Sequence, residues 1–476
     1  MTKELTKGNP FKLILFFAIP IFLGNVIQQL YNIVDTIIVG HTVSTNAMTG
    51  IGCTGSITFF ILGFANGLTA GFGIKLSQCF GSGDTEALKK NIATSLILCA
   101  AMSVILTAIA IPMTSPLLKM MKTGKEYFDY AYWYLMIIFA GIAATVLYNM
   151  VAYALRAIGD SKAPLVFLTV SAVLNIGFDL LFILVFKLNY TGAALATVLS
   201  SLISGAASLV YMFWRYPFIR LKAKDFKTSA KLIYGQISIG LPMALQFSIT
   251  AIGCIIQQTA LNGLNDTNKG CVTAYTAASK IHNFVDQTLF AIGTTVANYV
   301  GQNTGAEKYG RIKDCVFVSM IYVVICWIAG ILLCLLLGNS MMGLFIDKST
   351  GDGLLYYDKI ISYGKRFLMC QSSMYIMLGA ILVYRSALQG MGRSSIAVIA
   401  GFMELIGRSV ASFVLVKLLG YTGICFSDPI AWIAANLYLI PTYYVIISKK
   451  KGNREYTLSS LFKKRKTTTE AENNND

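Results

Sequence analysis

An aspartate stands inside a long apolar stretch near the start of the chain. Asp35 lies within the run 11–40, and three polar side chains precede it, namely Gln28, Tyr31 and Asn32. At this three- and four-residue spacing the four side chains share one face of a helix, and the opposite face is aliphatic. Because apolar surroundings disfavour an ionised carboxyl, Asp35 is suited to taking up and releasing a proton.

A second polar group lies further along the chain. Asn175 and Asp179 are four residues apart in the apolar segment 163–186, and Thr197 lies in the next segment. An amide, a carboxyl and a hydroxyl can together surround a proton or a small monovalent cation. If their segments are neighbours, we expect these three residues to form one hydrogen-bonded cluster, with Asp179, like Asp35, a candidate for coupling to an ion.

The composition indicates which elements hold these residues. The 476-residue chain is 55% hydrophobic and 13% charged, with a mean hydropathy of +0.64, whereas soluble domains carry about 25% charged residues. The apolar runs repeat along the chain and exceed the roughly 20 residues that cross a bilayer as a helix. Strands of membrane barrels need only about 10 residues, so these runs are too long for barrel strands. The sequence therefore predicts an all-α integral membrane protein.

Twelve transmembrane helices are predicted, as two six-helix repeats around a central cleft. Three motifs recur in order in the two halves: 17–20 with 239–242, 78–90 with 301–313, and 155–162 with 388–395. Each half has an even number of spans, so the repeats are parallel, and such lobes commonly rock to give alternating access. The predicted spans are 12–40, 48–75, 86–113, 126–155, 163–186, 190–214, 237–262, 270–299, 309–338, 356–388, 394–418 and 423–447.

The charge distribution predicts the orientation. The net charge is +17, and most loop Lys and Arg residues fall on the side shared by both termini, which the positive-inside rule assigns to the cytoplasm. We expect a multi-pass plasma-membrane protein, with the basic stretch 463–466 contacting lipid headgroups rather than nucleic acid. The expected parts are a cytoplasmic N-terminus (1–11), an N-lobe (12–214), a basic linker (215–236), a C-lobe (237–448) and a tail (449–476).

The sequence gives little support for disulfides, metal sites or a second acidic site in the other half. The ten cysteines include no CxxC pair, and the two histidines are His41 and His282, so neither a disulfide framework nor a metal site is expected. In the second half, Gln257 stands where the repeat places Asp35, and we interpret Glu404 and Arg408 as an internal ion pair. The sequence leaves open the partners of Lys280, Asp286 and Arg385.

Aromatic side chains make up 12% of the chain. Tyrosine rings bind flat cationic compounds by stacking and cation–π contact, and nearby acids attract such guests. We expect a substrate cavity lined by Gln28, Tyr31, Asn32, Tyr148, Asn149 and Tyr153. The sequence contains no GxxxxGK[ST] motif, so we expect no cofactor, and a proton or sodium gradient rather than ATP to supply the energy.

Four stretches together resemble the multidrug and toxic compound extrusion (MATE) family, nearest to its MepA-like bacterial members. They are LYNIVDTIIVG (30–40), LRAIGD (155–160), NIGFD (175–179) and SALQGMGR (386–393), and the resemblance extends from about Pro10 to Lys450. It implies two six-helix lobes around a cleft that opens alternately to each side. It also implies export of organic cations and other drugs in exchange for protons or sodium ions.

The resemblance also implies residue roles. In the family's proton-linked bacterial branch, an acid in span one works with an Asn and an Asp in span five and a Thr in span six, which match Asp35, Asn175, Asp179 and Thr197. Gln28 and Tyr31 match the lining of the drug pocket. Members that also use the second lobe have a carboxylate in span seven, where this sequence has Gln257 and Gln258, so sodium coupling there is not expected.

Other function classes compete with this hypothesis. A flippase for a lipid-linked precursor has a related helical layout but should present a cationic cavity, whereas the stripe of span one is acidic and neutral. An intramembrane enzyme would need a paired nucleophile and base or an HExxH-type metal motif, which the sequence lacks. A passive channel would need a pore-lining motif. The leading hypothesis is a monomeric secondary antiporter for amphipathic cations, not an enzyme.

Overall fold

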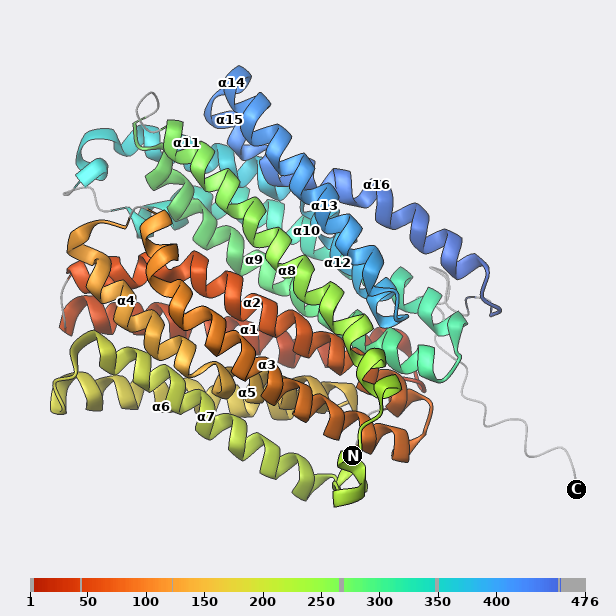
Figure 1. The fold of residues 1–476 in the computed structure, drawn as a ribbon. Coiled ribbons are helices and arrows are strands. Elements are labelled where there is room, and N and C mark those ends of the chain that lie inside the picture. The colour runs from red at the N-terminus through yellow and green to blue at the C-terminus, as the bar shows by residue number, and fades with distance from the viewer. Residues whose placement is uncertain are drawn as a thin grey trace, which may run out of the picture.

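The computed structural model describes residues 4–42, 45–121, 123–264, 269–346, 351–452 and 454. Over these residues it contains helices and no strands, arranged as two lobes side by side (Figure 1). The N-lobe, red to yellow in Figure 1, consists of α1 (Pro10–Thr42), α2 (Thr45–Gly81), α3 (Thr85–Met120), α4 (Lys125–Ala140), α5 (Ile142–Ala157), α6 (Lys162–Leu180), η1 (Leu181–Val185) and α7 (Asn189–Arg215).

The C-lobe, green to blue, follows two short 3₁₀ turns, η2 (Pro217–Ile219) and η3 (Ala223–Phe226), in the expected linker. Its first helix begins at Ala230, within the segment 215–236, so the linker's last residues are already helical. The lobe consists of α8 (Ala230–Leu264), α9 (Cys271–Gly305), α10 (Tyr309–Phe345), α11 (Gly351–Ser373), α12 (Tyr375–Gly390), α13 (Ser394–Val410), η4 (Ala411–Leu415), α14 (Val416–Leu419), α15 (Tyr421–Cys425) and α16 (Ser427–Ser448). Most of the tail, including 463–466, lies outside the described residues.

The number of spans follows from length and composition. Among the described residues, nine helices are long and apolar enough to cross a membrane, and two bent pairs bring the number to eleven. The remaining predicted span, 270–299, is α9, which has 35 residues and is long enough but more polar. α9 packs against α1 and α2 of the other lobe as well as against its own. Because protein rather than lipid covers much of α9, its polarity is compatible with a membrane position.

The two halves share two irregularities at matching positions. The α4–α5 pair bends by 51° and the α11–α12 pair by 45°, and the breaks at Gly141 and Met374 fall at corresponding places in the two halves. A π-helical turn begins at Leu181, after α6, and another begins at Ala411, after the corresponding helix α13. A π-helical turn interrupts the regular hydrogen bonding of an α-helix. Its recurrence at the same place in both halves supports a duplicated six-helix unit.

α1 presents two exposed faces in opposite directions. Leu23, Leu30 and Ile37, at seven-residue intervals, are 44%, 50% and 51% exposed. Gln28 and Asn32 are exposed on the opposite side of the helix. α6 and α9 cover the flanks between these faces. The aliphatic face is suited to lipid, and the polar face carries the stripe that the sequence predicted.

Small residues allow the lobes to touch along α2 and α8. Gly67 and Gly71 of α2 lie against the backbone of Ala244 and Gly240 of α8, with no room for a side chain between them. Close backbone approach through small residues is how many transmembrane helices associate. In Figure 1, α8 accordingly runs beside α2 along the boundary between the two lobes.

The lobes also meet in a two-fold pattern where α2 and α9 end. Gly81 of α2 lies against the carbonyl group of Gln302, and Gly305 of α9 lies against the carbonyl group of Gln78. Gly81 and Gly305 hold the same place in the two repeats, and so do Gln78 and Gln302, so the duplicated unit meets its copy here. The structure is therefore tightly closed between the lobes at this end of the bundle.

Candidate functional site

The structure brings the four predicted ion-coupling residues together inside the N-lobe. Asp35 comes from α1, Asn175 and Asp179 from α6, and Thr197 from α7. The Asn175 amide donates to Thr197 Oγ1 at 3.3 Å, and the Thr197 hydroxyl donates to the Ala193 carbonyl at 3.1 Å. Asn175 is 1% exposed and Asp179 is fully buried. The helical spacing predicted the shared face, and packing of α1, α6 and α7 supplies the contact.

The carboxyl groups of Asp35 and Asp179 face each other within hydrogen-bonding reach. Within the described part of the chain, no donor reaches either carboxyl oxygen of Asp179, Oδ1 of Asp35 or Oδ1 of Asn175. The pair can therefore hydrogen-bond only if one carboxyl carries the proton itself. Two ionised carboxylates at this separation repel, and a buried oxygen without a partner is costly. A shared proton, or a monovalent cation beside the amide oxygen, relieves both effects.

Two tyrosines flank the carboxyl pair. Tyr31 lies one turn before Asp35 on α1, and its hydroxyl group reaches Thr197. Tyr134 of α4 also lies close to both Asp35 and Asp179. The spacing along span one indicated Tyr31. Tyr134 was missed, because nothing in the local sequence of α4 separates it from the neighbouring aromatic residues.

The other predicted cavity residues on α5 lie apart from this pair. The Tyr148 hydroxyl donates to the Pro164 carbonyl at 3.1 Å, and the Tyr153 hydroxyl donates to Asn66 Oδ1 at 3.0 Å. Asn149 is half-buried beside Tyr148. Tyr153 is one turn from the end of α5, at the end of the bundle where α1 begins. Both tyrosine hydroxyls therefore join helices of the N-lobe in this state.

The C-lobe contains a buried polar network centred on Asp428 of α16. Oδ1 of Asp428 accepts from Nε and Nη2 of Arg408 of α13, at 3.0 and 2.8 Å. Oδ2 accepts from the amides of Gln257 of α8 and Gln371 of α11, at 3.0 and 3.2 Å. Each carboxylate oxygen thus has two donors, and Arg408 neutralises the charge. No sequence pattern pointed to Asp428, which stands near the start of its span.

The predicted ion pair between Glu404 and Arg408 is wrong. Glu404 instead accepts from Arg385 of α12 at 2.8 Å, in a pair whose side chains are 10% and 7% exposed, and Arg408 binds Asp428. Four-residue spacing permits a pair within one helix. Here each residue finds an oppositely charged partner on a neighbouring helix, so the two ion pairs join α12, α13 and α16. This also identifies the partner of Arg385.

A third buried group of the C-lobe involves α9. His282 Nε2 lies 3.2 Å from Asp286 Oδ2, and His282 Nδ1 is hydrogen-bonded to the Tyr375 hydroxyl at 2.9 Å. The His282 and Tyr375 rings also stack, with centres 5.3 Å apart. The partner of Asp286 is therefore on its own helix, and the group ties α9 to α12.

The polar clusters of the two lobes occupy related positions but differ chemically. Gln257 stands in the second repeat where Asp35 stands in the first, and Arg408 of α13 stands close to the place that Asp179 has on α6. In the N-lobe, two carboxyl groups face each other, and within the described part of the chain three of their four oxygens have no donor. In the C-lobe, a guanidinium and two amides satisfy one carboxylate completely. Of these two clusters, the one in the N-lobe has acceptor positions left for a proton or a cation.

Fold and site together define a class: an all-α membrane transporter of two related lobes, with a donor-deficient acidic cluster inside the first. The MatE family model matches residues 20–181 and 242–415, one segment in each lobe and more than half of the chain in total. The chain belongs to the MATE family of efflux transporters. Members of this family are transporters and not enzymes, as the sequence predicted.

Known relatives are similar over most of their length. "Probable multidrug resistance protein YpnP" of Bacillus subtilis (strain 168) is 26% identical, over 82% of this chain and 84% of that protein. "Multidrug export protein MepA" of Staphylococcus aureus (strain MRSA252) is 21% identical, over 89% and 91%. A solved structure described as an outward-facing conformation of a multidrug resistance MATE family transporter has a TM-score of 0.84 and 22% identity, and covers 95% of this chain and 100% of that one. The likeness in structure shows the fold.

Proposed function

We propose that this transporter exports amphipathic organic cations in exchange for protons, by alternating access of its two lobes. The observation that supports the proposal is the pair of Asp35 and Asp179, in which no donor among the described residues reaches three of the four carboxyl oxygens. The relatives named as multidrug resistance or export proteins support the drug substrates. The exposed polar stripe of α1, with Gln28 and Asn32, leads towards the pair and offers a place for a cationic guest.

The exchange follows from the chemistry of the pair. With both carboxyls ionised, the cluster attracts a cation, and the neighbouring tyrosine rings can contact its flat apolar part. When a proton enters, it can bridge Asp35 and Asp179, and one of the two negative charges that held the guest is neutralised. Proton and drug therefore compete for one site, which is a requirement for the exchange of one for the other. A sodium ion could be held by the same oxygens together with the amide of Asn175.

Alternating access requires contacts that hold one end closed and can break. The Gln78 side chain of α2 donates to the Gly390 carbonyl of the C-lobe at 2.9 Å, and the Gln302 side chain of α9 donates to the Ala157 carbonyl of the N-lobe at 2.8 Å. These two hydrogen bonds, which we name the glutamine latch, cross the lobe boundary in opposite directions. They lie where α2 and α9 end, and both must break before the lobes can part there.

Removing the glutamine latch should favour opening at this end. In the double variant Gln78→Leu/Gln302→Leu, two buried carbonyls lose their donors in the closed state but meet water in the open state. At about 1 kcal/mol for each hydrogen bond, the open-to-closed ratio should rise by about thirtyfold. Spin labels at positions 82 and 307 should report the longer distance. Gln258→Leu removes an exposed bond to Asn262 and should leave the distances unchanged; unchanged distances in the double variant as well would contradict the latch.

The orientation and assembly complete the proposal. The loops next to the glutamine latch belong to the basic side of the protein, so the positive-inside rule places this closed end in the cytoplasm. We propose that both termini are cytoplasmic, that the protein acts in the plasma membrane, and that it works as a monomer. The structure then corresponds to a state closed towards the cytoplasm.

Dye transport into everted vesicles tests the function directly. A proton gradient, acid inside, should drive uptake of an organic-cation dye, and a sodium gradient at equal pH should not. Uptake driven by sodium alone would keep drug export but replace the coupling ion. Absence of uptake under both gradients, from vesicles that contain folded protein, would reject drug export and favour the lipid flippase.

A further inference from the structure

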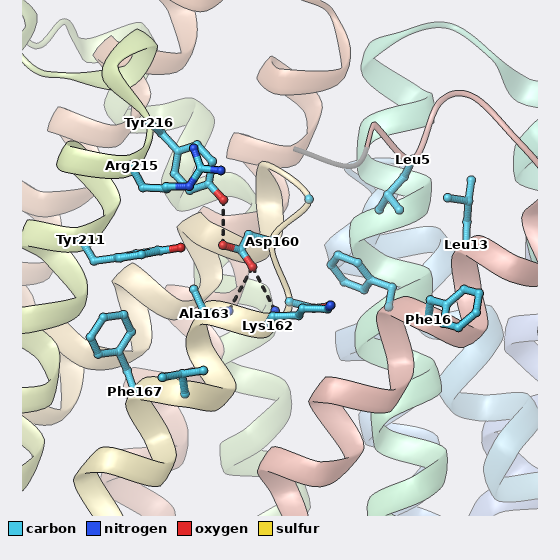
Figure 2. Close-up of a pocket in the computed structure, with 14 residues that line it drawn as sticks. Leu5, Leu13, Phe16, Asp160, Lys162, Ala163, Phe167, Tyr211, Arg215 and Tyr216 are labelled. Carbon is cyan, nitrogen blue, oxygen red and sulfur yellow. Dashed lines mark hydrogen bonds between the residues drawn. The ribbon is translucent and has the colours of Figure 1, made fainter. Parts of the chain in front are cut away.

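A cavity of about 500 Å³ lies between the start of α1, the start of α6 and the end of α7 (Figure 2). It is separate from the ion-coupling cluster, none of whose residues line it. Three apolar helices begin or end around it, at the same end of the bundle as the glutamine latch. Such a position corresponds to the boundary between hydrocarbon and headgroups of a bilayer.

One side of the cavity is apolar. Leu13 and Phe16 of α1 and Val166 and Phe167 of α6 line this side. Phe16 is 55% exposed and Val166 is 56% exposed, although both belong to membrane-spanning segments. This exposed apolar wall lies within the first turns of two spans. It is therefore suited to the part of a hydrocarbon chain that lies next to the lipid headgroup.

The other side of the cavity carries two cations. Lys162 stands at the start of α6 and Arg215 at the end of α7, and both are exposed. Over the described residues, neither has a carboxylate within salt-bridge distance. Arg215 lies over the ring of Tyr216, 5.7 Å from its centre. Both cations line the cavity, and the carboxylate of Asp160 lies between them (Figure 2).

The carboxylate of Asp160 forms no ion pair with either cation. Its Oδ1 accepts from the backbone N–H groups of Lys162 and Ala163, each at 3.0 Å, and its Oδ2 accepts from the Tyr216 hydroxyl at 2.7 Å (Figure 2). Burial and the bond to Asp160 raise the pKa of Tyr216, so its hydroxyl remains a donor at physiological pH. Asp160 therefore shapes the turn before α6 and leaves the side chains of both cations available.

We propose that this cavity binds one anionic phospholipid, with its phosphate near the exposed Lys162 and Arg215 and an acyl chain along Phe16 and Val166. A basic pocket between helices at the cytoplasmic surface suits an anionic headgroup, and the leaflet follows from the proposed orientation. A cationic drug would meet two like charges and one carboxylate, Asp160, whose oxygens already accept three hydrogen bonds. A zwitterionic lipid would bring its own cation beside Lys162 and Arg215. The bound lipid would join the start of α1, the helix that carries Asp35, to α6 and α7.

Native mass spectrometry of the purified full chain tests the site, with phosphatidylglycerol and phosphatidylcholine as probes. The wild type should retain one phosphatidylglycerol in preference to phosphatidylcholine. Lys162→Gln/Arg215→Gln should weaken phosphatidylglycerol binding by about thirtyfold, since each cation near an anionic membrane surface contributes a factor of about five. Val166→Trp, which fills the apolar side and keeps both charges, should weaken it as well. Lys224→Gln/Lys227→Gln removes two exposed linker cations outside the cavity and serves as the charge-matched control.

Three outcomes would overturn the proposal. The first is equal retention of the two lipids by the wild type. The second is equal loss of phosphatidylglycerol in the cavity and linker variants, which would indicate a general charge effect. The third is binding of glycerol phosphate as tight as that of the whole lipid, with no effect of Val166→Trp, which would show a site for free phosphate rather than for a lipid.

Discussion

Asp179→Asn should abolish proton-driven drug export while leaving the protein at least as stable as the wild type. In one-for-one exchange, a gradient of one pH unit can sustain about a tenfold gradient of a monovalent cation. The wild type should approach that value in proteoliposomes. The variant should show no accumulation above protein-free liposomes, because an amide cannot exchange the proton that the carboxyl pair holds. Asp35→Asn should behave in the same way.

Stability separates this explanation from a structural one. Over the described residues, no donor reaches either oxygen of Asp179, so the substitution removes no hydrogen bond other than one through a proton shared with Asp35, and the new amide can donate to Asp35 in its place. The thermal midpoint in detergent should therefore stay the same or rise. Asp129→Asn, at an exposed acid on α4, controls for loss of charge and should transport normally. Full proton-driven export by Asp179→Asn would remove this pair from the mechanism.

The polar residues of the N-lobe could be predicted because helix geometry alone fixes which residues share a face. Asn175 and Asp179 are four residues apart, and the stripe of α1 repeats at the same interval, so no knowledge of the neighbouring helices was needed. A carboxyl in an apolar span is also rare enough to draw attention. The repeat could be found for a related reason, since the glycine-rich turns between helices are short and keep their order.

The C-lobe network could not be predicted, because its partners are far apart in the sequence. Arg408 lies near Glu404 along the helix, yet it binds Asp428, which reaches it from α16. Spacing within one helix cannot show which helix packs beside it. The position of Tyr134 near the carboxyl pair and the bends at Gly141 and Met374 depend on packing in the same way. The sequence thus predicted which residues share one face of a helix. Which residues they contact on other helices depends on how the helices pack.

Arg408→Met should strongly destabilise the protein. It leaves Asp428 buried with its charge uncompensated and only two amide donors, and breaking a buried ion pair in this way costs about 3–5 kcal/mol. The free energy of unfolding, measured by denaturant titration in micelles, should fall by that amount. Lys90→Met breaks an exposed ion pair with Glu86 and should change it by less than about 1 kcal/mol.

The double variant Arg408→Met/Asp428→Asn then tests where coupling takes place. An asparagine at 428 can still accept from Gln257 and Gln371, and no buried charge remains, so most of the lost stability should return. If the N-lobe alone exchanges protons, this variant should still sustain the wild-type dye gradient. A folded double variant that binds the dye but no longer responds to a proton gradient would assign a coupling role to the C-lobe. The complete pairing of Asp428 with four donor groups argues for the first result, because a carboxylate held in this way has no position left for a proton to enter.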